Sequence, residues 1–141
     1  MADTTPAAAG PETEAPRGEL ALRTLAMPAD TNPSGDIFGG WLMGQMDIAG
    51  GIVAGTRAGG RVATVAVDGF VFHKPVYVGD VVCCYADIAA VGNTSIKIVI
   101  QAWALRGRQV DHRVKVTEGT FTFVALDEAG GKRPVPPAPG A

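Results

Sequence analysis

The stretch from Ile37 to Thr56 carries no charged side chain except Asp47. A carboxylate in apolar surroundings is costly to keep ionised unless it is paired or used. As a helix, the stretch places four glycines on one stripe with Asp47, namely Gly40, Gly44, Gly51 and Gly55. Because each glycine costs a helix about 1 kcal/mol relative to alanine, the stripe indicates a close approach there. The approaching group is either a ligand, a strand or a partner helix.

The same stretch is long enough to raise the question of a membrane span. Asp47 lies near its middle, where a carboxylate costs roughly 2.5–3.5 kcal/mol on insertion scales. Gln45 and the glycines weaken the case further. The stretch therefore predicts a buried helix, and no membrane partner is expected.

The bulk composition limits the class of protein. A chain of 141 residues fits one domain, and a hydrophobic content of 47% is enough for a core. The net charge of −2 offers no basic footprint, so a nucleic-acid partner is not expected. The adjacent residues Cys83 and Cys84 would face opposite sides of a strand and are badly placed to bridge each other, which favours a reducing compartment, the cytoplasm. The N-terminus has no basic start or long apolar run, so no signal peptide is expected.

Composition changes mark the domain boundaries. Residues 1–18 are rich in Ala, Pro, Thr and Glu, and residues 128–141 are rich in Pro and Gly. Such segments bury too little apolar surface to fold, so both tails are expected to be disordered. The folded domain is expected to span 19–127.

Hydrophobic patterning within this domain predicts one long helix and five strands. The helix is expected over Ile37–Arg57, apolar nearly all round and capped by Ser34 or Asp36. The strands are expected at Glu19–Ala26, Val62–Phe72, Asp80–Val91, Ser95–Leu105 and Arg113–Leu126. Because the links between the later strands are short, the sheet is expected to be antiparallel, and helix and sheet must cover each other. The fold class is therefore α+β, with a long central helix wrapped by an antiparallel sheet: the hot-dog arrangement.

The strand Ser95–Leu105 predicts an oligomer. One of its faces is wholly apolar, and the other, which carries Lys97, Gln101 and Trp103, is half apolar. A second, partly apolar sheet face is expected to find a partner chain.

The local sequence then points to a family. The segment Leu25–Asp47 contains the pattern Asn-x-x-Gly-x-x-Phe-Gly-Gly, followed by the aspartate. It closely resembles the start of YciA-type acyl-CoA thioesterases. Further resemblance lies in five shorter segments, 61–67, 74–76, 78–85, 95–98 and 120–125. The resemblance covers about 22–127, nearly the whole expected domain.

This resemblance implies hydrolysis of an acyl-CoA thioester to CoA and a free fatty or other carboxylic acid. In such enzymes the helix carboxylate, here Asp47, is a general base or nucleophile. The loop asparagine, here Asn32, helps to place water or substrate, and the pair Gly39 and Gly40 offers a backbone N–H to the thioester oxygen. The site lies between two subunits, so a dimer is the minimum, and a trimer of dimers is common among relatives.

The residues support a shared site independently. The start of a helix supplies free N–H groups and partial positive charge, and glycine lets a carbonyl approach the backbone closely. Gly40 and Asp47 are separated by seven positions, roughly 10 Å along one helix. One carbonyl carbon cannot easily touch both in the same chain, whereas an antiparallel second helix would bring the carboxylate in. Without the resemblance, however, Asn32 is an ordinary turn former.

Coenzyme A is expected only as part of the substrate and product, and the implied reaction needs no metal or redox cofactor. Phosphate binding calls for a turn with free N–H groups and nearby cations. The turn Gly92-Asn93-Thr94-Ser95 fits the first need, and relatives place the pyrophosphate near it. Relatives often have an arginine where this chain has Asn93, and Lys74 is one possible substitute cation. Phe72 is expected to line the acyl tunnel with Met43 and Met46.

Two other functions on this fold remain to be weighed. An acyl-thioester dehydratase normally pairs a histidine with an acidic residue, but this chain has Phe38 before the glycine pair and no histidine on the helix. The nearby His73 is interpreted as structural. A non-catalytic acyl-CoA or nucleotide sensor is the second alternative, although binding alone does not need a desolvated carboxylate.

Overall fold

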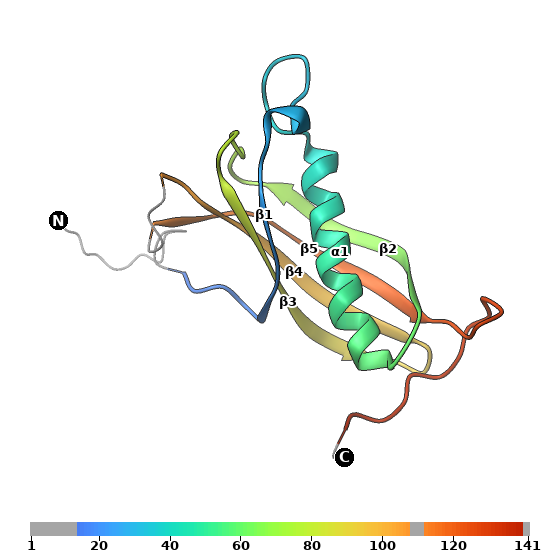
Figure 1. Cartoon of the computed structure of the whole chain (residues 1–141). Coiled ribbons are helices and arrows are strands. Elements are labelled where there is room, and N and C mark those ends of the chain that lie inside the picture. Colours follow the sequence, from blue (N-terminus) through green and yellow to red (C-terminus); the bar gives the residue numbers. More distant parts are fainter. Residues whose placement is uncertain (1–13, 108–111, 140–141) are drawn as a thin grey trace.

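One helix lies along one face of a five-stranded antiparallel sheet, as Figure 1 shows. The computed structural model describes residues 14–107 and 112–139. In chain order the elements are β1 (Glu19–Leu25), a 3-10 turn (Pro28–Asp30), α1 (Gly39–Ala58), β2 (Val62–Phe72), β3 (Val81–Val91), β4 (Ser95–Leu105) and β5 (Arg113–Ala125). The α+β hot-dog fold expected from the sequence is confirmed.

The strand order explains which parts of the sheet are open to a neighbour. The order is β1-β3-β4-β5-β2, and every neighbouring pair is antiparallel. Strands β1 and β2 therefore form the two edges. Strand β2 also exposes large apolar side chains, among them Val65 and Val71. An edge with unpaired backbone groups and apolar side chains is a ready surface for another chain.

The start of α1 differs from the sequence expectation. Ordered helix begins at Gly39, Phe38 takes the N-cap position, and no side chain caps the helix. The predicted capping by Ser34 or Asp36 is therefore wrong, because both residues belong to the loop that Asn32 organises. The helix ends at Gly59, whose φ of 69° is left-handed and suits glycine.

The tightest contact between helix and sheet is at Gly50. A Cβ placed there would lie 2.5 Å from Ile100 Cδ1 and 2.7 Å from Phe123 Cζ. No such neighbour lies within 4 Å of a Cβ placed at Gly40, Gly44 or Gly51. The close approach made by the chain itself is therefore at Gly50, outside the predicted stripe, and the stripe stays open.

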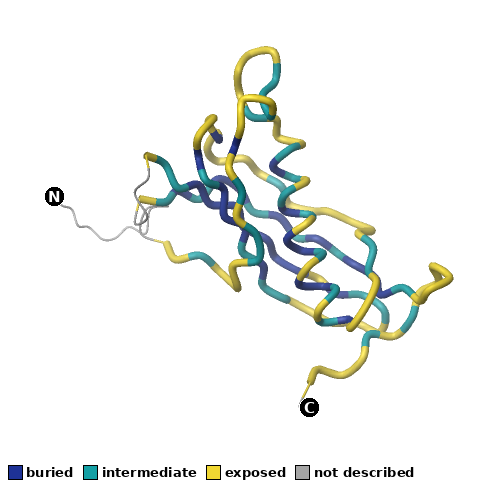
Figure 2. The backbone as a smooth tube through the Cα atoms, in the orientation of Figure 1, coloured by how far each residue is buried: buried dark blue, intermediate teal, exposed yellow. Residues whose placement is uncertain are grey.

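The open stripe belongs to an exposed face of α1. Leu42, Met46 and Val53 are buried against the sheet, whereas Ile48 and Ile52 are 52% and 51% exposed. Figure 2 shows this alternation along the helix. The expectation of a helix buried all round is therefore wrong for a single chain, because only one side of α1 contacts the sheet.

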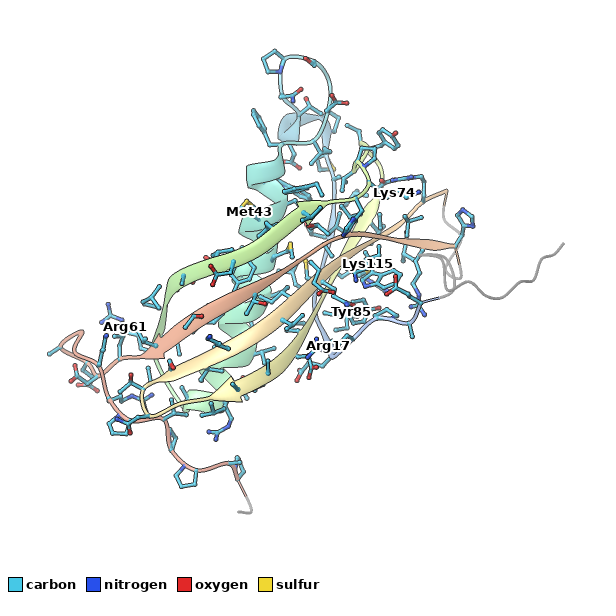
Figure 3. All side chains as sticks on the ribbon, turned by 180° about the vertical axis from the view of Figure 1, so that it is seen from behind. Arg17, Met43, Arg61, Lys74, Tyr85 and Lys115 are labelled. Atoms are coloured by element: carbon cyan, nitrogen blue, oxygen red, sulfur yellow. The ribbon has the colours of Figure 1, made fainter. Side chains whose placement is uncertain are left out.

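The face of the sheet away from the helix, seen in Figure 3, carries a polar network around buried Trp103. Trp103 Nε1 donates to Gln101 Oε1 over 3.0 Å, and the backbone N–H of Arg17 donates to the same oxygen over 2.9 Å. Gln101 Nε2 in turn donates to Glu118 Oε1, which also accepts from Lys115 Nζ, each over 2.8 Å. The chain thus satisfies the polar groups of this face itself.

The C-terminal segment differs from the disorder that its composition suggests. Val135 packs against the core, and its N–H donates to Asn93 O over 2.8 Å. Arg133 and Arg57 add hydrogen bonds to backbone oxygens. Composition could not reveal these contacts because they depend on where the helix and the β3–β4 turn end. Residues 1–13 of the expected N-terminal tail lie outside the described residues, and their disorder stays a prediction. Within residues 14–18, Arg17 is held by hydrogen bonds to Gln101 and Asp87.

Both cysteines are buried and unpaired. Burial raises the pKa of Cys84 to about 12, and the neighbouring Cys83 adds to the effect. A thiol with such a pKa is inert at neutral pH. Within the described ranges, no helix combines the length and hydropathy needed to cross a bilayer.

The contact at Gly50 predicts a coupled effect on stability. Gly50→Ala should lower the free energy of unfolding by about 1–3 kcal/mol, because the added methyl overpacks the interface. Ile100→Val removes the Cδ1 atom nearest to that methyl. The loss caused by Gly50→Ala should therefore be smaller in the Ile100→Val background. Denaturant unfolding of the four proteins measures this, and strictly additive losses would contradict the contact.

The polar network predicts a pH dependence of stability. The hydrogen bond from Lys115 lowers the pKa of Glu118 below its ordinary value of 4.5, and partial burial opposes this only in part. A lowered folded-state pKa stabilises the fold above the unfolded-state value, and the effect is lost as the pH falls through the folded-state value. Glu118→Gln should therefore be less stable than wild type at neutral pH, and the difference should disappear as the pH falls from about 4.5 through the lowered pKa of Glu118. A gap that is constant with pH in urea titrations would contradict this assignment.

Candidate active site

The first half of the candidate site is the start of α1, where backbone N–H groups lack acceptors. The first bond of the helix runs from Leu42 N to Phe38 O. The amides of Gly39 and Gly40 precede it and have no side-chain cap. The helix dipole adds partial positive charge at this end. This end of the helix can therefore receive a carbonyl oxygen or an anion.

A groove of about 330 Å³ opens beside these amides. It brings together Gly39 with two other predicted site residues, Phe72 and Lys74. These residues meet because β2 runs back along the helix and ends beside its start. A Cβ at Gly39 would lie 3.5 Å from Phe72 Cζ. Lys74 is labelled in Figure 3, just beyond the end of β2.

The groove also includes residues that sequence reasoning did not assign to the site. Asp36 and His73 both line it. The backbone of His73 is fixed by its N–H, which donates to Val116 O over 2.8 Å. No spacing in the sequence relates position 36 to position 73. The two residues meet only because β2 returns to the start of the helix, which the sequence alone does not show.

Asn32 organises the loop that leads into this groove. Its Oδ1 accepts hydrogen bonds from the backbone N–H groups of Ser34 and Asp36 over 2.9 and 3.1 Å. Its own backbone N–H donates to Asp36 O over 2.7 Å. This is the turn-forming behaviour expected of asparagine. These hydrogen bonds occupy the side-chain oxygen of Asn32. Among the described residues, the side-chain N–H group of Asn32 has no protein acceptor.

The second half of the candidate site is Asp47, in the middle of α1. Thr64 of β2 donates from Oγ1 to Asp47 Oδ1 over 2.5 Å. Among the described residues, no lysine, arginine or histidine forms a salt bridge with this carboxylate. Asp47 is thus held by a neutral hydroxyl, and its charge is not neutralised within the chain.

Asp47 borders an open, mostly apolar hollow of about 230 Å³. The hollow is lined by Met43, Gly44, Val67 and Phe121, together with Thr64. Gly44 leaves the carboxylate accessible because a Cβ at that position would meet nothing within 4 Å. The open glycine stripe therefore exposes the carboxylate to an incoming group.

The two hollows do not merge within one chain. They have no lining residue in common, and Gly40 and Asp47 are roughly 10 Å apart along the helix axis. One helix therefore carries free amides at its start and an accessible carboxylate near its middle, too far apart to contact one carbon atom within one chain. The arrangement is chemically complete only if a second helix supplies the missing half.

The predicted phosphate-binding turn lies at the opposite end of the helix from Gly39 (Figure 1). Gly92 N donates to Ser95 O over 2.7 Å, which closes the turn. The oxygens of Asn93 and Thr94 accept from Val135 N and Ala125 N. The structure therefore does not bring the turn together with Asp47 or the glycine pair in one chain.

Comparisons with known proteins show the family of the chain. Residues 34–111 match the thioesterase superfamily. The acyl-CoA thioester hydrolase YciA of Salmonella typhimurium is 57% identical over 123 residues, which cover 86% of this chain and 92% of the relative.

Solved structures point the same way. The hexameric thioesterase from Yersinia pestis is 57% identical with a TM-score of 0.84, covering 88% of this chain and 100% of its own. The hexameric hot-dog thioesterase of Campylobacter jejuni is 40% identical with a TM-score of 0.78, covering 84% and 91%. An acyl-CoA hydrolase from Staphylococcus aureus, solved with butyryl coenzyme A and coenzyme A, is 32% identical with a TM-score of 0.74, covering 82% and 70%.

The fold and the family match define the class of protein, a hot-dog thioesterase. By sequence and structure, the chain belongs to the thioesterase superfamily and, within it, to the YciA-like acyl-CoA thioester hydrolases.

Proposed function

We propose that this protein hydrolyses acyl-CoA thioesters to a free acid and CoA, with Asp47 as the reactive carboxylate. The observation that supports the proposal most directly is the environment of the Asp47 carboxylate. It is oriented by Thr64, borders an apolar hollow and has no salt-bridge partner among the described residues. Its negative charge is not neutralised within the described part of the chain, so the carboxylate is free to accept a proton or to attack a carbonyl carbon. The relatives named as acyl-CoA thioester hydrolases support the substrate class.

In the proposed reaction the thioester oxygen lies at the amides of Gly39 and Gly40. Asp47 of the partner subunit takes a proton from water while the water oxygen attacks the carbonyl carbon. The amides stabilise the negative charge that forms on the carbonyl oxygen. The C–S bond then breaks, the sulfur leaves as the CoA thiolate and is protonated, and the acid remains. Asn32 helps to place the water or the substrate through its side-chain N–H group.

A second route begins with direct attack of Asp47 on the carbonyl carbon. It expels the thiolate and leaves a mixed anhydride, which water then hydrolyses. The two routes differ in the source of the oxygen found on Asp47. A single turnover in ¹⁸O-labelled water incorporates label into Asp47 only by the anhydride route.

Other residues contact the rest of the acyl-CoA substrate in this proposal. The amides of the Gly92–Ser95 turn receive the CoA phosphates, and Lys74 supplies a cation at the groove. Phe72 contacts the substrate beside the amides. The reaction uses no metal or redox cofactor, and CoA enters only within substrate and product. The two buried, unpaired cysteines favour the cytoplasm as its location.

The proposed enzyme is a homo-oligomer. A dimer is the minimum because Asp47 and the glycine pair must come from different chains. The exposed apolar edge of β2 and the open face of α1 are the surfaces available for it. The relatives from Yersinia pestis and Campylobacter jejuni are hexameric, which supports a trimer of dimers.

The test compares Asp47→Ala with wild type on a panel of acyl-CoA thioesters, using thiol release as the measurement. Loss of a positioned base or nucleophile should lower kcat by about 10²–10⁴-fold. Asp87→Ala is the matched control, because Asp87 lies on β3, away from the β2 edge, pairs with Arg17 and lines neither hollow. This control should stay within about twofold of wild type.

Equal rates for Asp47→Ala and wild type would remove Asp47 from the mechanism. If wild type releases no thiol from any acyl chain but still binds CoA, the protein is a sensor on the same fold and the proposal fails.

A further inference from the structure

The C-terminal segment, residues 132–136, is tied to the end of α1 by two arginines. Arg133 donates from Nη2 to Ala58 O over 2.9 Å and from Nε to Leu126 O over 3.0 Å. Ala58 is the last residue of α1, where carbonyl groups lack helical partners and a cation is favourable. Arg57 of the helix donates to Pro136 O over 2.6 Å. The segment is thus held at both ends.

Between these anchors, Val135 reaches the turn between β3 and β4. Its side chain packs against the core, and its N–H donates to Asn93 O over 2.8 Å. On the other side of the turn, Ala125 N donates to Thr94 O over 2.9 Å. Two successive carbonyl groups of the turn are therefore fixed by backbone donors from β5 and the segment that follows it.

Fixing a carbonyl group also fixes the next amide. The C=O of one residue and the N–H of the next belong to a planar trans peptide group and point in opposite directions. The bond from Val135 to Asn93 O therefore turns the N–H of Thr94 away from the C-terminal segment. Within the described ranges, the N–H groups of Asn93 and Thr94 have no protein acceptor. The turn thus presents two free donors, and the direction of one of them, the N–H of Thr94, is set by the hydrogen bond from Val135.

We propose that the C-terminal segment is a positioning element that holds the Gly92–Ser95 turn in the geometry that binds the phosphates of CoA. The inference rests on the proposed function, since the phosphates are those of its substrate. Free N–H groups at a turn bind an anion well only if they are already aligned. The hydrogen bond from Val135 supplies this alignment without touching the substrate.

Two substitutions at one position separate alignment from packing. Val135→Pro removes the N–H donor and retains an apolar side chain, and its neighbours Pro134 and Pro136 already restrict the backbone. Val135→Ala retains the donor and removes side-chain packing. Circular dichroism and the elution volume of each full-length variant confirm that it is folded and assembled.

The readout is the difference between substrates with and without the nucleotide. An acyl-CoA is compared with the pantetheine thioester of the same acyl group, which lacks the 3′-phospho-ADP. Val135→Pro should raise KM for the acyl-CoA about 3–10-fold, the effect of one lost hydrogen bond, and leave kcat nearly unchanged. KM for the pantetheine thioester should not move, and Val135→Ala should resemble wild type with both. The affinity for CoA itself, measured by calorimetry, should fall by the same factor in Val135→Pro alone.

Equal losses for CoA and pantetheine compounds would show a merely structural role and overturn the inference. Unchanged kinetics in Val135→Pro would also overturn it. If wild type hydrolyses neither thioester, the proposed function fails, and the calorimetric comparison of the two variants still decides the role of the segment.

Discussion

The contact of Gly50 with Ile100 and Phe123 determines how closely α1 lies on the sheet. It lets α1 lie directly on the sheet, at a distance that a methyl group would already disturb. Because the helix lies so close, Asp47 reaches the hydroxyl of Thr64 on β2. For the same reason the start of the helix meets the end of β2 and forms a groove there.

The length of the helix then creates the need for a second chain. A helix rises about 1.5 Å per residue, so a base at position 47 and amides at positions 39 and 40 cannot serve one carbonyl carbon. Packing this helix against the sheet leaves the opposite face, with Gly44 and Gly51, open. Two copies in antiparallel arrangement would place each carboxylate opposite the amides of the other. In the proposed mechanism, the need for an oligomer thus follows from a distance within the monomer.

The sequence predicted the parts of this structure that rest on local pattern. Alternation and apolar runs gave the strands and the helix, and the isolated charge of Asp47 gave a site candidate. The sequence could not show which glycine makes the close contact with the sheet, because that depends on how the helix crosses the sheet. The contact is at Gly50 and not at a glycine of the stripe. Nor could it show Thr64 as the partner of Asp47. The composition of the C-terminal segment suggested disorder, since its hydrogen bonds are to residues far along the chain.

The central claim is that each active site combines Asp47 of one subunit with the helix start of another. Subunits with Asp47→Ala can be mixed with subunits carrying Gly39→Pro and Gly40→Val, which remove one amide donor and shield the other. Asp47→Ala alone should lose about 10²–10⁴-fold in activity, and the double glycine variant alone about 10²–10³-fold. After unfolding and joint refolding, random pairing should restore about a quarter of the wild-type thioesterase rate, because half of the dimers then contain one intact site. No gain over the separate variants, with mixed oligomers present, would contradict the account.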